Sequence, residues 1–301
     1  MFNPQLRAAR WLPRTAVGPR TLPVIRLLTR LAGARSNAQI VQVDADVSVH
    51  VFRPASAPHP APALLWIHGG GMVLGTAAQD SHFCQRFADQ LTIVVASVEY
   101  RLAPEHPFPT PLDDCYTALR WLAANPEIDP ARIAIGGASA GGGLAAALTL
   151  LARERGEIHP VLQLLSYPML DDRTTSRTDI DPRRLRMWNQ NSNRFGWRAY
   201  LGPATADAEV PRLAAPSRYE DLSGLPAAWI GVGTNDLFHD EDVAYARRLQ
   251  QAGVACTLHV VPGAYHAFDS IEAKAAISQD FLRAQTAALD EALNRGDHTL
   301  T

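Results

Sequence analysis

The run Gly137-Ala138-Ser139-Ala140-Gly141 constrains the fold of this chain more than any other part of its sequence. It follows Arg132–Ile135, which predicts a short strand, and precedes residues 140–155, which are typical of a helix ended by Gly156. A serine between glycines at a strand-to-helix turn is the pattern of a nucleophile elbow, where small neighbours let a strained turn hold the hydroxyl at the sheet edge. A glycine-rich helix N-terminus that binds an anion is the alternative interpretation.

Short apolar runs alternate with helical patterns along most of the chain. Strands are expected at residues 63–67, 92–98, 132–135, 161–166, 227–232 and 256–261, and helices at 79–90, 111–124, 140–155, 240–252 and 270–293. This alternation predicts an α/β fold with a mostly parallel sheet covered by helices on both faces. Residues 40–53 alternate apolar and polar side chains, which indicates an antiparallel strand pair or one long edge strand.

Charge is unevenly distributed along the chain. Of 301 residues, 28 are basic and 30 acidic, yet residues 1–35 contain seven arginines and no acidic residue. The rest of the chain therefore has a net charge of −9. A nucleic-acid-binding domain normally carries a basic stripe, so no nucleic-acid partner is expected. The 47% of hydrophobic residues also excludes intrinsic disorder.

Cysteine usage and hydropathy bear on where the protein works. Cys84, Cys115 and Cys256 form no C-x-x-C pair, so they predict neither a zinc site nor a redox motif. Sparse, unpaired cysteines indicate reduced thiols and a cytoplasmic location. No stretch approaches 18 consecutive apolar residues, so stable membrane insertion is not expected. The arginine-rich leader at 1–35 lacks the apolar core of a signal peptide; an organelle transit peptide is the alternative, but serine is scarce there.

A second glycine-rich motif, His68-Gly69-Gly70-Gly71, follows the strand expected at 63–67. Attack of a serine on a carbonyl creates a tetrahedral oxyanion, and each backbone N–H aimed at it lowers the barrier by about 3 kcal/mol. Three glycines let the backbone approach that charge without side-chain obstruction. The amide after the nucleophile, here Ala140, is expected to complete this oxyanion hole. Taken alone, the glycines fit a simple tight turn equally well.

A serine nucleophile also needs a histidine base, which follows it in this fold. The histidines downstream of Ser139 include His159, His239, His259 and His266. His266 is the candidate because it lies in a loop just after the last expected strand, from which it can reach the carboxyl edge of the sheet. His259 lies within that strand.

Asp236 is the predicted acid that orients the histidine. It comes directly after the strand expected at 227–232, at the same edge of the sheet. Residues 240–242 (Asp240, Glu241, Asp242) are expected to cap the following helix. The sequence contains no H-E-x-x-H or similar ligand cluster, so neither a metal nor a cofactor is expected.

With these motifs the chain resembles the hormone-sensitive-lipase-like branch of α/β-hydrolase esterases. The matching blocks are His-Gly-Gly-Gly at 68–71, Tyr-Arg-Leu-Ala-Pro-Glu at 100–105, Gly-Ala-Ser-Ala-Gly-Gly at 137–142, Trp-Arg-Ala-Tyr-Leu-Gly at 197–202 and Asp-Leu-Phe-His-Asp-Glu at 236–241. The resemblance implies an α/β-hydrolase fold with a helical cap, oxyanion donors at Gly70, Gly71 and Ala140, and hydrolysis of short- to medium-chain acyl esters. Ala138 and Leu237 depart from residues common in the family and bear on acyl preference.

The resemblance also divides the chain. Residues 1–40 are expected to form an N-terminal cap segment, and residues 41–301 an α/β-hydrolase catalytic domain. Residues 171–216 interrupt the strand–helix alternation and are expected to be an insertion that completes the cap. The arginine-rich leader is then interpreted as a mobile lid segment over the site.

Two alternatives to an esterase stay open in the sequence. One is an enzyme of the same fold that cleaves amides or carbamates. The other is a non-catalytic ligand receptor like the gibberellin receptors, which resemble this family but lack the catalytic histidine. The expected partner is a small-molecule ester, and the last sheet edge could pair with a second subunit in a homodimer.

Charged residues after the strand expected at 92–98 are expected to be structural. Arg101 and Glu105 are predicted to form an ion pair that fixes their loop. Asp113 and Asp114 adjoin a helix and are expected to be solvated or capping.

Overall fold

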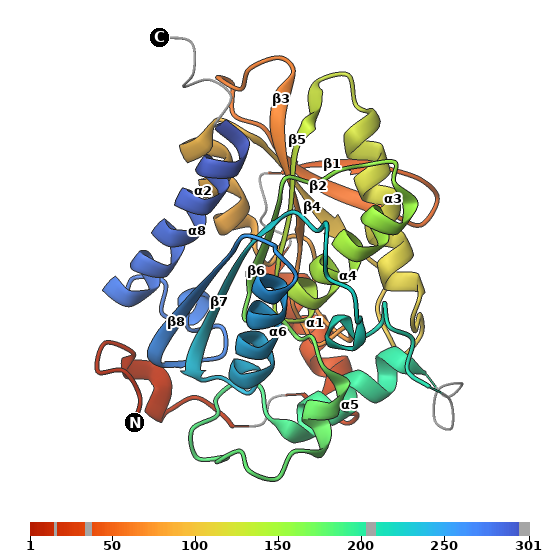
Figure 1. Cartoon of the computed structure of the whole chain (residues 1–301). Coiled ribbons are helices and arrows are strands. Elements are labelled where there is room, and N and C mark those ends of the chain that lie inside the picture. The colour runs from red at the N-terminus through yellow and green to blue at the C-terminus, as the bar shows by residue number, and fades with distance from the viewer. Residues whose placement is uncertain (15–16, 34–37, 203–208, 295–301) are drawn as a thin grey trace.

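A computed structural model describes residues 1–14, 17–33, 38–202 and 209–294. Its centre is an eight-stranded sheet in the order β1-β2-β4-β3-β5-β6-β7-β8 (Figure 1). The strands are β1 (Gln39–Gln42), β2 (Ser48–Phe52), β3 (Ala61–Ile67), β4 (Val94–Glu99), β5 (Ile128–Ala138), β6 (Leu162–Ser166), β7 (Ala227–Asn235) and β8 (Cys256–Tyr265). All neighbours from β4 to β8 pair in parallel, whereas β1 and β2 are antiparallel. The predicted α/β fold and the antiparallel pair at 40–53 are both confirmed.

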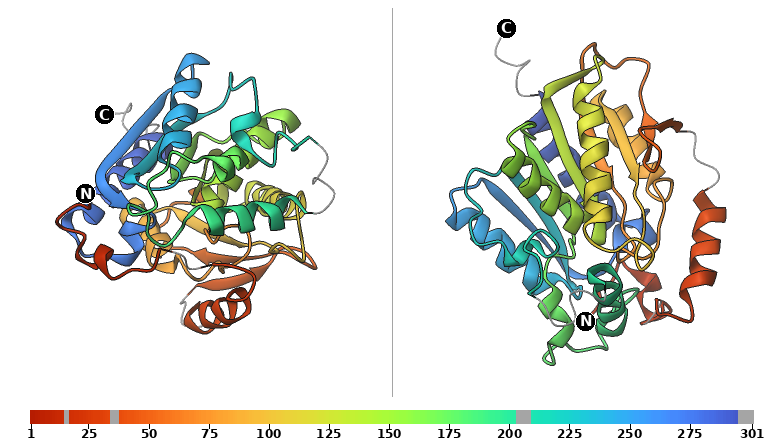
Figure 2. Two further views of the ribbon diagram at one scale, coloured as in Figure 1. Left: turned by 90° about the horizontal axis from the view of Figure 1, so that it is seen from below. Right: turned by 90° about the vertical axis from the view of Figure 1, so that its right-hand side faces the viewer.

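Helices cover both faces of this sheet (Figures 1 and 2). They are α2 (Ser81–Leu91), α3 (Thr110–Ala124), α4 (Ala140–Arg155), α6 (His239–Gln251), α7 (Phe268–Ile271) and α8 (Ala276–Asn294). Side chains of a strand alternate between faces, so Leu65 packs in one hydrophobic cluster with α3, α4 and α6, and Trp66 packs in another with α2 and α8. Every residue of β3 is buried, as an apolar run in the middle of a parallel sheet requires.

The helix expected at 270–293 is interrupted, which corrects the prediction of one continuous element. The short α7 ends at Ile271, with Glu272 as its C-cap, and α8 begins at Ala276. The Glu272 carboxylate accepts hydrogen bonds from the Tyr265 hydroxyl at 2.8 Å and from the Ala8 N–H at 3.1 Å. These contacts to β8 and to the N-terminal segment hold Glu272 outside the helix, and a local helical pattern does not reveal them.

Two segments far apart in the sequence meet at the carboxyl end of the sheet. One contains the 3-10 helix η1 (Arg7–Arg10) and α1 (Leu22–Gly33); the other contains η2 (Asp172–Ser176), α5 (Gln190–Leu201) and η4 (Pro216–Arg218). The Ser192 hydroxyl donates to the Val17 carbonyl at 2.8 Å, and the Met187 N–H donates to the Pro13 carbonyl at 3.0 Å. The N-terminal segment and the insertion, the two segments expected to form a cap, thus pack on each other.

The loop after β4 is fixed by different ion pairs from the one predicted. Arg101 binds the buried Asp114 at 2.7 Å, and Glu105 binds Arg26 of α1 at 2.8 Å. The expected Arg101–Glu105 pair is therefore wrong, as is the expectation that Asp114 is solvated or capping. Asp114 points inward from α3 and also accepts the Arg101 N–H at 2.9 Å, so the loop is tied to this helix.

Two further features of the described residues bear on membrane insertion and on pairing with a second subunit. Within these residues, no helix combines the length and the apolar character needed to cross a membrane. The sheet ends at β1 and β8, and β8 is the edge at which the predicted homodimer would pair.

Candidate active site

Ser139 lies at a sharp turn between β5, which ends at Ala138, and α4, which begins at Ala140. Its φ of 57° and ψ of −122° are a strained combination for a residue with a side chain. A Cβ at Gly141 would lie 2.0 Å from the Ile67 carbonyl oxygen, so only glycine lets α4 approach β3 this closely. The turn thus has the geometry of a nucleophile elbow.

His266 and Asp236 continue from this serine in one hydrogen-bonded chain. His266 Nε2 is 2.9 Å from Ser139 Oγ, and His266 Nδ1 is 2.8 Å from Asp236 Oδ2. The second oxygen of Asp236 accepts the Phe238 N–H at 3.0 Å, which fixes the carboxylate. Asp236 follows β7 and His266 follows β8, so parallel strands bring both to the same sheet edge as Ser139.

The other downstream histidines that the structure describes, His159, His239 and His259, take no part in this chain of hydrogen bonds. His239 Nδ1 binds Asp240 at 2.7 Å, and the ring of His259 packs near those of Trp229 and Phe281. His159 is exposed just before β6.

The acidic residues at 240–242 lie in the first turn of α6 but do not cap it as expected. The cap position is Phe238, and no side chain caps there. Glu241 instead accepts hydrogen bonds from the Leu170 N–H at 2.7 Å and the Asp171 N–H at 3.1 Å, which anchors the start of the insertion. Asp242 is fully buried, and burial raises its pKa well above the ordinary value. These acids could not be distinguished from caps by position alone.

The His68–Gly71 loop lies directly against the elbow. Gly70 and Gly71 have φ values of 130° and 62°, and a Cβ at Gly71 would lie 2.1 Å from the Trp188 ring. The Tyr100 hydroxyl donates to the His68 carbonyl at 2.9 Å, and the two rings stack at 4.3 Å. Burial lowers the pKa of His68 to about 4, so its ring is neutral and supports the loop without adding charge. Ala140 is the first residue of α4, so its N–H has no intrahelical acceptor.

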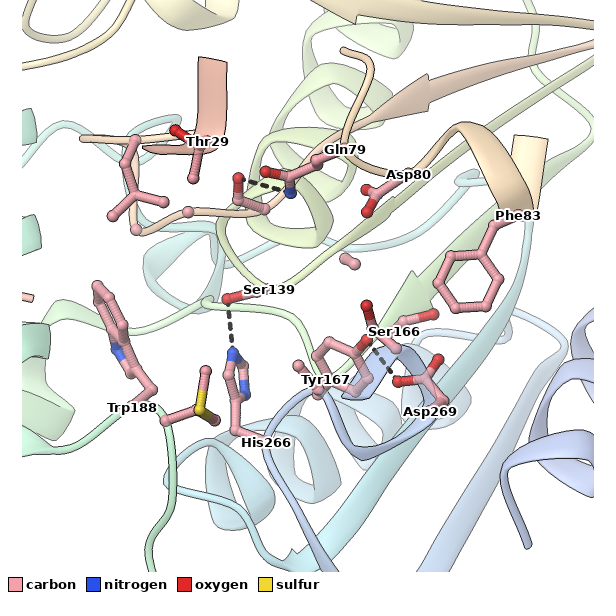
Figure 3. Close-up of a pocket in the computed structure, with 18 of the residues that line it drawn as sticks. Thr29, Gln79, Asp80, Phe83, Ser139, Ser166, Tyr167, Trp188, His266 and Asp269 are labelled. Carbon is pink, nitrogen blue, oxygen red and sulfur yellow. Dashed lines mark hydrogen bonds between the residues drawn. The ribbon is translucent and has the colours of Figure 1, made fainter. Parts of the chain in front are cut away.

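A cavity of about 300 Å³ opens onto Ser139 and His266. On one side of Ser139 lies Trp188, and on the other lie Asp80, Phe83, Tyr167 and Asp269 (Figure 3). The cavity is also lined by Val17, Ile25, Thr29 and Met187 from the two packed segments, and by Ser166 and Gln285 from the core. No motif or periodic pattern in the sequence marks these wall residues, so their place in the cavity could not be predicted.

Within the described parts of the chain, no group of three or more His, Cys, Asp or Glu side chains is arranged to hold a metal ion. The polar groups that converge on the cavity are instead those of a covalent acyl-transfer site: a serine, a histidine and a carboxylate in line, beside a glycine-rich loop.

Comparisons with known proteins agree with this fold. Residues 64–270 match a protein family described by the alpha/beta hydrolase fold, and the chain belongs to it. Within that fold the chain belongs to the hormone-sensitive-lipase-like carboxylesterases, and it is a carboxylic ester hydrolase. The comparisons thereby confirm the resemblance and the enzyme class expected from the motifs.

Three similar proteins illustrate the relationship. Carboxylesterase NlhH of Mycobacterium tuberculosis is 34% identical over 83% of this chain and 77% of its own length. Ethyl acetate hydrolase of Pseudomonas putida is 37% identical over 73% of this chain and 70% of its own length. The structure of a bacterial heroin esterase superposes with a TM-score of 0.87 at 38% identity, covering 97% of this chain and 98% of that one.

Proposed function

We propose that this carboxylesterase works through Ser139 as nucleophile, His266 as general base and acid, and Asp236 as the carboxylate that orients the histidine. The single observation that carries this proposal is the unbroken hydrogen-bonded chain from Ser139 Oγ through both nitrogens of His266 to Asp236 Oδ2, at 2.9 and 2.8 Å. A serine hydroxyl is a weak nucleophile until an adjacent base accepts its proton.

The reaction follows from these positions. His266 Nε2 takes the Ser139 proton as the oxygen attacks the ester carbonyl, and Asp236 stabilises the imidazolium that forms. The N–H groups of Gly70, Gly71 and Ala140 are proposed to hold the oxyanion. His266 then protonates the leaving alcohol, and the acyl group stays on Ser139. Water, activated by the same histidine, releases the acid and restores the serine.

We further propose that the acyl group is short to medium in length. The cavity of about 300 Å³ lies at the small end of ligand pockets. Trp188 and Met187 close it on the side of the insertion, and Val17 and Ile25 line it from the N-terminal segment. A wall built from these two segments supports the view that they form a cap over the site and set the acyl preference.

Replacement of the nucleophile tests the mechanism. Ser139→Ala should abolish hydrolysis of p-nitrophenyl butyrate and labelling by a fluorophosphonate, because both need the serine oxygen. Ser223→Ala, at an exposed position outside the cavity, is the matched control and should retain both. Circular dichroism should report the same fold for both variants. Turnover by a folded Ser139→Ala enzyme would contradict the proposal.

A further inference from the structure

The cavity contains two buried carboxyl groups that the proposed reaction does not use. Asp80 lies just before α2 and is 7% exposed, and Asp269 lies in α7 and is 3% exposed. Both line the cavity beside Ser139 and His266, on the side away from Trp188 (Figure 3). The two residues lie far apart in the sequence, yet the fold brings both to one wall of the cavity.

Neither carboxyl group has a lysine or arginine partner in that wall, although the charged form of His266, the one histidine among the described residues that line the cavity, lowers the pKa of Asp269. Asp80 accepts a hydrogen bond from Trp66 Nε1 at 2.9 Å, and Asp269 accepts one from the Tyr167 hydroxyl at 2.8 Å; both donors are neutral. The described residues that line the cavity include neither lysine nor arginine. Asp114 is buried to a similar degree, but it binds the Arg101 guanidinium. Burying a charge without a partner is costly, so an unpaired acidic wall needs an explanation.

Two further buried polar side chains that line the cavity have an atom without a hydrogen-bond partner. Ser166 is 1% exposed and Gln285 is 2% exposed, and both line the cavity. Among the residues that the structure describes, Ser166 Oγ and Gln285 Nε2 make no hydrogen bond. Buried polar groups in native proteins are rarely left unsatisfied. Unsatisfied atoms that face a cavity beside a nucleophile indicate that a ligand group completes them.

We propose that Asp80, Ser166, Asp269 and Gln285 form an acidic subsite that binds an ammonium group of the ester substrate. This inference rests on the proposed function, since it places the ammonium group in the same cavity as the scissile ester. A protonated amine supplies the positive charge that the two carboxylates lack. Its charge attracts both carboxylates, and its N–H groups, three in a primary and one in a tertiary ammonium, can donate to a carboxylate oxygen or to Ser166 Oγ. Gln285 can join the acceptors only if its amide is flipped, so that its oxygen faces the cavity.

The electrostatics of this wall agree with the assignment. Burial, together with the nearby Asp269 charge, raises the pKa of Asp80 to about 6. Burial likewise raises the pKa of Asp269 to about 6. A bound cation favours the charged form of each carboxyl group, so it relieves this burial cost. A neutral alkyl group in the same place would leave the cost unrelieved.

Matched substrates test the subsite from both sides of the ester. On the alcohol side, 2-(dimethylamino)ethyl acetate is compared with its carbon analogue 3-methylbutyl acetate. On the acyl side, methyl 4-(dimethylamino)butanoate is compared with methyl 5-methylhexanoate. Hydrolysis is followed by titration of the released acid at neutral pH. The cationic member of one pair should have a kcat/KM at least about tenfold higher, as expected for charge-assisted hydrogen bonds.

Two variants assign that preference to the carboxyl groups. Asp80→Asn and Asp269→Asn should each reduce the ratio of kcat/KM for the cationic ester to kcat/KM for its neutral analogue, and the ratio cancels any general loss of activity. Asp89→Asn, which removes an exposed carboxylate from α2, should leave the ratio unchanged. A ratio near one in the wild-type enzyme for both pairs would overturn the inference without any variant, as would a preference that survives both substitutions.

A neutral hydroxylated ester, 3-hydroxy-3-methylbutyl acetate, separates charge from simple hydrogen bonding. If it is favoured and the cationic ester is not, the wall binds hydroxyl groups and the ammonium proposal is wrong. Failure of the esterase mechanism has a different outcome: no ester of either kind is hydrolysed and Ser139 is not labelled by a fluorophosphonate. Hydrolysis of the neutral esters with no preference for the cation contradicts the subsite alone.

Discussion

The two sides of the cavity are built by different means. The acidic subsite is carried by the catalytic core: Asp80, Ser166, Asp269 and Gln285 all belong to, or directly flank, elements packed on the central sheet. The opposite wall, with Met187 and Trp188, comes from the insertion and packs on the N-terminal segment. One side is polar and buried in the core, and the other is apolar and formed by two added segments. Recognition of charge and recognition of chain length can therefore change independently around one catalytic serine.

The largest expected effect is a loss of kcat that should be equal for substrates recognised on either side of the cavity. Asp236→Asn should lower kcat by about 10⁴, because the histidine that it orients serves every substrate. The loss should be the same for cationic and neutral esters, and for short and longer acyl groups. Steady-state kinetics on both substrate pairs measures it.

Asp240→Asn is the matched control for this prediction. Asp240 is four residues away and binds Arg177 at 2.7 Å rather than His266. It should retain activity close to that of the wild type. If Asp240→Asn instead loses about as much as Asp236→Asn, Asp236 does not orient the histidine.

The glycine loop connects the proposed oxyanion hole to the apolar wall. A methyl group added to this loop tests whether catalysis depends on the position of the loop. Gly71→Ala places a Cβ against the Trp188 ring at a φ of 62°, so the loop must move. We expect kcat to fall by about 10²–10³, the loss measured for one oxyanion donor. Gly224→Ala has nearly the same φ, 67°, with open space around it, and controls for backbone strain. Equal activity in both variants would show that the loop position does not matter for catalysis.

Removal of one acidic carboxyl group should alter how stability depends on pH. Burial raises the pKa of Asp80 to about 6 from an ordinary value of 3.8, so the folded chain holds this proton more tightly than the unfolded chain. Stability from this group is present below about pH 4 and is lost as the pH rises through about 6, by up to about 3 kcal/mol. In Asp80→Asn that loss should be absent. Urea unfolding at about pH 4 and pH 7 measures it.

The free energy of unfolding of Asp80→Asn, relative to wild type, should thus be higher at pH 7 than at pH 4. The exposed Asp89→Asn should show no such shift. If the stability of Asp80→Asn relative to wild type is the same at both pH values, the charged form of Asp80 is not costly in the folded chain. The distinction between a polar, charge-bearing side and an apolar side of the cavity would then be weaker.

Local patterns in the sequence identified the residues that the structure brings together around Ser139, but not the residues that form the cavity walls. Ser139 and the glycine loop stand in short motifs at strand ends, and parallel strands bring such ends together, so their positions followed from the order of elements. Asp80 and Asp269 have no such motif, because their proximity depends on how α2 and α7 pack on the sheet. The environment of Asp114 could not be predicted for a related reason. An acid in the first turns of a helix has the same sequence signature whether it faces water or Arg101.

The smallest expected effect belongs to the apolar wall. Trp188 is 5% exposed, contacts the Gly71 backbone and donates weakly to Asn193 Oδ1 at 3.3 Å, so its indole fills space rather than taking part in the chemistry. Trp188→Ala should enlarge this side of the cavity and raise the ratio of kcat/KM for p-nitrophenyl hexanoate to that for the acetate by about tenfold, the scale of one or two methylene contacts. Trp121→Ala, at a half-buried tryptophan of α3 that does not line the cavity, is the control. The charge preference measured with 2-(dimethylamino)ethyl acetate should be unaffected in both. If Trp188→Ala alters charge preference and not chain length, the two sides of the cavity do not divide recognition as their construction indicates.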